Sequence, residues 1–264
     1  MIKDITLGQY LPGNSPVHRL DPRTKIILIF AYIVMIFMVK NVPGYLISTL
    51  FLIASCLISK IPMKMIAKSI KPLMFFVIFT AIINLFMTSG QIIFQLGFLK
   101  ITKEGAVLTV KMALRLILLV TGTSLLTYTT SPIVLTDGIE SLLSPLSKIG
   151  VPSHEIAMMM SIALRFIPTI IDETDKIIKA QSARGSDFES GNLIRRAKAL
   201  VPILVPLFIS AFRRADDLAV AMECRCYHGG KNRTKLKSLK MTGLDYISIL
   251  IFAVIFTAAL VWGR

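Results

Sequence analysis

The chain has 264 residues, of which 54% are hydrophobic and 17% are charged. A soluble domain usually carries about 25% charged residues, and here the apolar residues come in blocks of the kind that cross membranes. The net charge of +15 comes from Lys and Arg residues that flank these blocks, which argues against nucleic-acid binding and for a membrane protein with a basic cytoplasmic side.

Four apolar runs follow a polar N-terminal segment, 1–25, that lacks the features of a cleavable signal peptide. The runs cover residues 26–39, 45–58, 73–87 and 106–128. Pro43 and Gly44 mark a turn between the first two runs, and a basic loop at 60–71 precedes the third. The first two runs are shorter than the roughly 20 residues of an untilted span, so each needs flanking residues to cross. We predict four transmembrane helices within 26–130.

The sequence becomes charged and amphipathic from 131 to 243, and a last apolar run at 244–264 is long enough to cross a membrane. With the N-terminus inside, the inner segments hold 24 of the 30 Lys and Arg residues, as the positive-inside rule requires. The sequence therefore predicts an all-α integral membrane protein with about five transmembrane helices. The segment 131–243 is expected to be a cytoplasmic domain of three amphipathic helices, and the C-terminus is expected outside.

Lys111 and Arg115 interrupt the fourth run with two positive charges. They are four residues apart, so on a helix they share one face. Two interpretations stay open: a polar contact inside a complex, or a span that begins only after them, near Leu116.

Two of the cytoplasmic helices have ends that repeat each other. The second helix is expected to begin after Ser153 and the third near Asn192, with Pro202 and Pro206 kinking the third or delaying its start. At each end an Arg follows an Asp by nine residues and an Ala by four, and small residues flank the Arg. The two tips consist of Ala183, Arg184 and Gly185, and of Cys224, Arg225 and Cys226.

The tip arginines have two interpretations. A cation at a helix C-terminus complements the helix dipole, which is worth about 0.3–1 kcal/mol. Alternatively, each guanidinium offers a rigid fork of donors to the carboxylates or helix carbonyls of a partner, and the small neighbours let that partner approach. Both helices are also unusually apolar, so Met158, Met159 and Phe212 are candidate contacts for a membrane partner, with core filling as the alternative.

No motif for catalysis or metal binding is present. The sequence has no phosphate-binding G-x-x-x-x-G-K-[ST] loop and no H-E-x-x-H. Cys224, Cys226 and His228 lack a second pair of ligands, so we expect no zinc site. We therefore expect no catalytic residue, no bound cofactor and no enzymatic activity. A secondary transporter or channel working alone would need ionisable residues in several spans and two similar halves, which this sequence lacks.

Several of these segments resemble the transmembrane coupling component of energy-coupling factor (ECF) vitamin importers, over nearly the whole chain. Residues 7–15 and 18–23 look like the N-terminal signature of that family, and 164–168 and 212–216 look like its helix motifs. Residues 183–185 match the first of its two short Arg motifs. Residues 224–227 occupy the second, where the family usually has Ala before the Arg and often Gly after it.

The resemblance implies a four-subunit complex in the plasma membrane of a prokaryote. Two ABC-type ATPases use ATP, a small membrane subunit binds a vitamin or another micronutrient, and the coupling component joins them. Each Arg motif is expected to dock into one ATPase, and closure of the ATPases would move the crossed helices and reorient the substrate-binding subunit. The chain looks like the shared type, which serves several exchangeable substrate-binding subunits. From the residues alone, a stand-alone secondary transporter or channel is the alternative.

Overall fold

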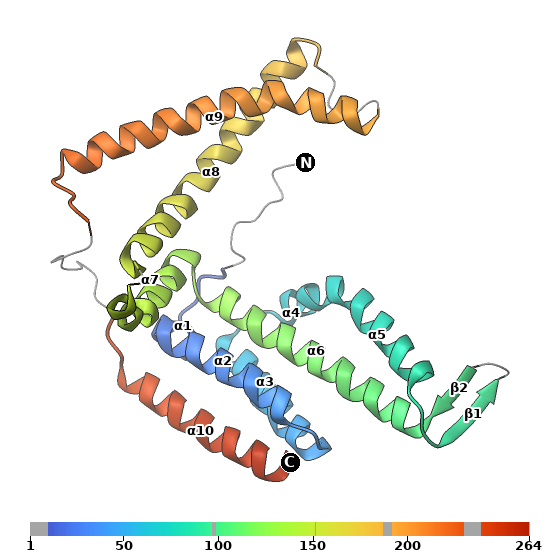
Figure 1. Ribbon diagram of the computed structural model, residues 1–264. Coiled ribbons are helices and arrows are strands. Elements are labelled where there is room, and N and C mark those ends of the chain that lie inside the picture. Colours follow the sequence, from blue (N-terminus) through green and yellow to red (C-terminus); the bar gives the residue numbers. More distant parts are fainter. Residues whose placement is uncertain (1–9, 97–98, 151, 187–191, 230–238, 264) are drawn as a thin grey trace. The chain divides into compact units, whose positions relative to one another are not determined.

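A computed structural model describes residues 10–96, 99–150, 152–186, 192–229 and 239–263. They form helices and one short β-hairpin (Figure 1), so the predicted all-α membrane architecture is confirmed apart from this hairpin. The chain divides into two compact units that are considered separately here. We call residues 8–138 with 239–264 the bundle unit, and residues 139–238 the crossed-helix unit.

The bundle unit contains most of the elements. In chain order they are α1 (Pro16–Arg19), α2 (Pro22–Met38), α3 (Val42–Ser59), α4 (Met63–Ile70), the 3₁₀ turn η2 (Lys71–Leu73), α5 (Met74–Met87), β1 (Ile92–Leu96), β2 (Leu99–Thr102), α6 (Lys103–Thr129) and α10 (Gly243–Gly263). α7 (Pro132–Leu143) leads from this unit into the crossed-helix unit. Several helices begin with a proline in the first turn, where its missing N–H leaves no hydrogen bond unmade.

The core of the bundle unit lies where α2, α3, α6 and α10 pack together. Its buried apolar side chains include Tyr32, Met35, Ile36, Val39, Leu52, Cys56, Leu118, Leu125, Phe252 and Ala259. Glycines bring two of the helices close: a Cβ on Gly44 of α3 would lie 2.8 Å from the Cα of Gly263 on α10. Small residues at such contacts are typical of helices that pack within a membrane.

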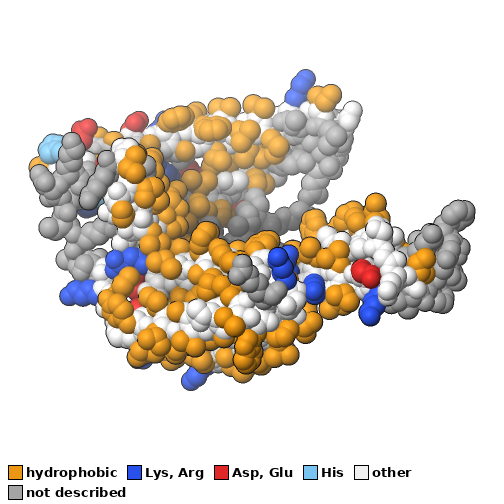
Figure 2. Space-filling model, turned by 60° about the horizontal axis from the view of Figure 1, so that its bottom comes forward, with side chains coloured by type: hydrophobic (Ala, Val, Ile, Leu, Met, Phe, Trp, Pro, Cys, Tyr) orange, Lys and Arg blue, Asp and Glu red, His pale blue; other side chains and the backbone are white. Residues whose placement is uncertain are grey.

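The surface of the protein is strongly apolar. Hydrophobic side chains cover much of the face shown in Figure 2. By length and composition, five helical segments could cross a membrane, and they span residues 42–59, 63–87, 103–129, 153–183 and 243–263.

The number of candidate spans agrees with the prediction, although two of the helices concerned are not the predicted ones. Helix α2, the predicted first span, has 17 residues and is not among the five. At 1.5 Å per residue it is roughly 25 Å long, the lower limit for crossing. Helix α8 (Ser153–Ala183), predicted to be cytoplasmic, is apolar enough to be included.

Two connecting segments contain secondary structure of their own. The basic stretch at 60–71 is not a loop: it contains α4, on which Lys64 and Lys68 are one turn apart and exposed. Pro62 precedes the first turn of that helix, where it does not break the hydrogen-bond pattern. The short apolar piece after Ser89 forms the antiparallel hairpin β1–β2, in which Leu96 pairs with Leu99.

The crossed-helix unit contains two long helices. Its elements are the end of α7, the 3₁₀ turn η3 (Ser144–Ile149), α8 (Ser153–Ala183) and α9 (Leu193–Glu223). Helix α9 runs without interruption through Pro202 and Pro206, so the prolines do not delay its start. The first of the three predicted cytoplasmic helices is divided into α7 and η3.

Candidate docking tips and the polar layer of the bundle

The first tip is a regular helix end. Arg184 is the C-cap residue of α8, and Gly185 follows with a positive φ of 87°. The N–H of Gly185 donates to the carbonyl of Ser182 at 3.0 Å, and the N–H of Ser186 donates to the carbonyl of Gln181 at 3.0 Å. These two bonds define a Schellman motif, which satisfies the last carbonyls of a helix.

The second tip has the same backbone geometry. The N–H of Cys226 donates to the carbonyl of Glu223 at 2.8 Å, and that of Tyr227 donates to the carbonyl of Met222 at 3.0 Å. Arg225 therefore occupies the position that Arg184 has in the first tip. Cys226 stands where the first tip has glycine, and it adopts a positive φ of 56°. A side chain in this left-handed region costs about 1–2 kcal/mol.

All six tip residues are exposed. Within the described ranges, neither Arg184 nor Arg225 forms an ion pair or a side-chain hydrogen bond. Exposed cations at two matched helix ends fit the dipole interpretation and the docking interpretation alike, so the geometry leaves both open.

A proline leaves one carbonyl of α9 without its helical hydrogen bond where the two helices meet near the first tip. Pro206 has no N–H, so the carbonyl of Pro202, one turn earlier, lacks its usual helical partner. The side-chain amide of Gln181 on α8 donates to that carbonyl at 3.4 Å. From this contact α9 continues for roughly 30 Å before it reaches Arg225. The two tips are thus far apart on one crossed pair of helices.

A second polar contact lies closer to the middle of the two helices. Arg214 of α9 donates to Glu173 of α8 at 2.6 Å, and the hydroxyl of Ser210 also donates to this carboxylate. Glu173 therefore meets residues later in α9 than Gln181 does, so the helices run antiparallel past each other. The carboxylate is partly exposed, so the pair stabilises the crossing modestly.

The candidate partner contacts are apolar and largely open. Met159 is 58% exposed and Phe212 is 68% exposed, while Met158 is partly buried. Val205 and Phe208 lie seven and four residues before Phe212 and are also exposed, so they share its helix face. Core filling within this chain does not explain Met159 or Phe212.

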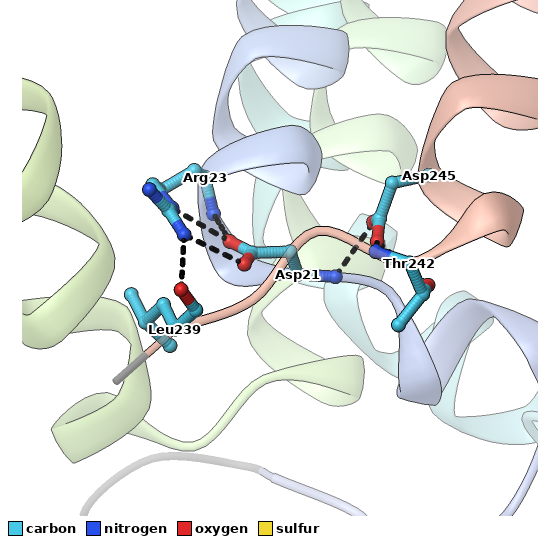
Figure 3. A network of polar contacts seen from close by, with 5 residues as sticks. All are labelled: Asp21, Arg23, Leu239, Thr242 and Asp245. Atoms are coloured by element: carbon cyan, nitrogen blue, oxygen red, sulfur yellow. Dashed lines mark hydrogen bonds and ion pairs between the residues drawn. The ribbon is translucent and has the colours of Figure 1, made fainter. Parts of the chain in front are cut away.

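The N-terminal signature forms a polar layer at one end of the bundle unit (Figure 3). The Asp21 carboxylate caps α2 by accepting from the N–H of Arg23 at 2.9 Å, and the Arg23 guanidinium returns two bonds to it. Arg23 also donates to the carbonyl of Leu239 at 2.8 Å, just before α10. Asp245 of α10 accepts from the N–H of Asp21 at 2.8 Å and from the N–H of Thr242 at 2.7 Å.

Asp245 was not among the residues singled out in the sequence, although a signal was present. Thr242 and Asp245 have the spacing of a capping box, in which an acidic residue bonds back to the N–H of the cap. Here the carboxylate does so with one oxygen, and with the other it accepts from the N–H of Asp21, the N-cap residue of α2. It is fully buried and therefore joins the starts of α2 and α10.

Lys25, two residues after the signature, binds the end of α6. The buried Lys25 ammonium donates to the carbonyls of His18 and Thr129 and to the hydroxyl of Thr130, at 3.0–3.1 Å. His18 donates from Nε2 to the carbonyl of Leu11 at 3.1 Å, so its Nδ1 is free to accept from a serine hydroxyl. Burial lowers the pKa of His18, which favours this neutral form. The signature is thus a structural clamp joining α2, α6 and α10.

These features define a class of protein: a helical, multi-pass membrane protein with an apolar bundle and a pair of long helices ending in matched arginine tips. Among the described residues, no group of three His, Cys, Asp or Glu side chains is placed to hold a metal ion.

Comparison with known sequences gives the family. The CbiQ family, described as cobalt transport protein, matches residues 13–236. A protein of Ruminiclostridium cellulolyticum named energy-coupling factor transporter transmembrane protein EcfT is 58% identical over 97% of this chain and 96% of its own length. Proteins of the same name from Clostridium kluyveri and Bacillus subtilis are 57% and 49% identical over the full length of both chains. The chain belongs to this family, the transmembrane components of ECF transporters.

Proposed function

We propose that this chain is the coupling subunit of an ECF-type importer. It would transmit ATP-driven motion of two cytoplasmic ATPases to a substrate-binding membrane subunit that takes up a vitamin or another micronutrient. The observation that carries the proposal is the matched pair of helix ends, with Arg184 and Arg225 on the same position of the same cap. Two equal, exposed and widely spaced tips suit two copies of one partner.

In this mechanism each tip docks into one ATPase. The guanidinium donates to carboxylates or exposed helix carbonyls, and the small neighbours admit the walls of the groove. When ATP brings the two ATPases together, the tips approach each other and α8 and α9 change their crossing. The contacts of Glu173 and Gln181 with α9 keep the pair together while it moves.

The exposed apolar side chains around Met159 on α8 and around Phe212 on α9 receive the substrate-binding subunit. Exposed apolar side chains on an otherwise charged unit are best covered by another protein or by lipid. The proposal places the chain in the cell membrane of a prokaryote, with the N-terminus and residues 131–243 in the cytoplasm. The chain itself catalyses no reaction, and its partners bind the ATP and the substrate.

Purification of the tagged chain from its own cells in a mild detergent tests this function. We expect ATPase subunits and a small membrane subunit to co-purify in fixed ratios, and ATP hydrolysis to reside in the former. A tagged chain that purifies alone or as a homo-oligomer, and still transports a solute in vesicles, would establish the stand-alone transporter instead.

A further inference from the structure

Arg115 is a positive charge within the long apolar helix α6, and its contacts in the described part of the chain are weak. Its Nη2 donates to the carbonyl of Val39 at 3.4 Å, and Nη1 lies 4.0 Å from the sulfur of Met112. The guanidinium carbon is 5.5 Å from the centre of the Phe37 ring. The first distance is long for a hydrogen bond, and sulfur is a weak acceptor.

A guanidinium has five N–H donors, and most of those on Arg115 are not used. Its Nε is buried and has no acceptor among the described residues. A charged group in an apolar surrounding needs an opposite charge or several good acceptors. The guanidinium therefore has unused N–H donors to offer to an anionic ligand.

Neighbouring contacts place Arg115 at the end of the bundle. Val39 is the C-cap of α2, and the backbone N–H groups of Lys40 and Asn41 both donate to the carbonyl of Gly263, at 2.9 and 3.1 Å. Helices α2 and α10 thus end at the same level, where the chain turns through a charged residue. A turn of this kind is typical of a membrane–water interface.

Two other cations are near Arg115 by their positions in the chain. Lys40 directly follows the residue whose carbonyl Arg115 contacts, and its side chain is exposed. Lys111 precedes Arg115 by one turn on the same face of α6 and is partly exposed. Apolar side chains next to the group are open, including Phe37 at 58% and Val110 at 58% exposure. Exposed apolar side chains of this kind suit contact with lipid.

We propose that Lys40, Lys111 and Arg115 bind the phosphate group of a membrane lipid at the end of the bundle where α2 and α10 terminate. A phosphate presents several oxygens to the fork of an arginine and to the point charge of a lysine, and it is the anion present at this depth of a bilayer. The acyl chains would lie along the exposed apolar side chains. The site requires only a bilayer around the bundle unit, so a test of lipid binding is independent of the proposed coupling function.

The single tryptophan of the chain allows a direct test. Trp262 is 69% exposed and precedes Gly263, whose carbonyl bonds to Lys40, so it lies at this end of the bundle. The full chain in detergent is titrated with brominated phosphatidylglycerol, which quenches tryptophan fluorescence on contact. A brominated glycolipid of the same chain length, which has no phosphate, is titrated in parallel.

We expect brominated phosphatidylglycerol to quench half of the Trp262 fluorescence at a lipid concentration at least tenfold lower than the brominated glycolipid requires. Arg115→Gln should raise that concentration by roughly tenfold through the loss of charged hydrogen bonds. Lys111→Gln, the second variant, should shift it in the same direction by a smaller factor. Lys64→Gln, on an exposed face of α4, is the matched control and should leave the curve unchanged.

Three results would overturn the lipid site. The first is equal quenching by both lipids, and the second is a phosphatidylglycerol curve that neither variant moves. The third is complete reversal by excess inorganic phosphate, which would assign the site to a free anion. Circular dichroism of each variant confirms that helix content is retained, and Lys111→Gln decides the question if Arg115→Gln loses its fold.

Discussion

Removal of the two tip arginines tests the docking proposal most sharply. Arg184 and Arg225 cap two helices through the same backbone hydrogen bonds, and both side chains are exposed. Truncation to Ala therefore leaves the fold of the crossed-helix unit intact, because the Schellman motif is made by the backbone. What is lost is the contact with a partner.

The size of the loss follows from the chemistry of the contact. A hydrogen bond to a charged group contributes about 1.5–3 kcal/mol, and the partner left unpaired adds to the loss. This corresponds to a factor of roughly 10 to 150 in affinity for one tip. Because both tips belong to one chain, a complex held by the remaining tip keeps the second ATPase near at a high effective concentration.

We therefore expect Arg184→Ala or Arg225→Ala alone to weaken assembly and transport partly, and the double variant to nearly abolish both. Arg→Lys at each position should rescue poorly, because a lysine lacks the planar fork of donors. The assay is co-purification of the ATPases together with substrate uptake by cells. Lys179→Ala, an exposed cation one turn before the first tip, is the control and should assemble normally.

A double variant that assembles and transports like the wild type would refute the docking reasoning. The arginines would then act only on the helix dipoles, worth about 0.3–1 kcal/mol each. Equal rescue by lysine would retain docking but refute the role of the guanidinium fork.

Three further predictions concern other parts of the chain. Cys226→Gly should stabilise the second tip by up to about 1 kcal/mol, since glycine adopts a positive φ without strain. Backbone hydrogen exchange at the end of α9 should then be slower, and unchanged exchange would contradict the prediction. Asp245→Ala should destabilise the bundle by on the order of 3 kcal/mol, because it leaves the N–H of Asp21 buried and unpaired. Thermal unfolding, followed by labelling of the buried Cys56 thiol, measures this loss, and an unchanged midpoint would show that water replaces the carboxylate. Met159→Asp with Phe212→Asp should release the substrate-binding subunit and retain the ATPases, as co-purification would reveal; loss of the ATPases instead would assign this face to them.

The sequence by itself determined the long helices and the class of protein. Long apolar runs and the placement of Lys and Arg indicated a helical membrane protein, because both patterns depend on nearby residues only. The tip repeat was also readable, since a helix end is a local structure. Apolar composition could not separate a helix that crosses the membrane from one that binds a partner, and for that reason α8 satisfies the criteria of a span while its motifs predict a coupling helix.

Only the tertiary structure decided which polar groups meet. Asp245 bonds to Asp21, 224 positions earlier in the chain, and Arg115 reaches the carbonyl of Val39, 76 positions earlier. No periodicity relates such residues, because their approach depends on how whole helices pack. The same holds for the carbonyl of Pro202. Pro206 leaves it without a helical hydrogen bond, and it accepts one from Gln181 on another helix. The local sequence therefore indicated which polar groups need a hydrogen-bond partner. The packing of the helices determined which residue serves as that partner.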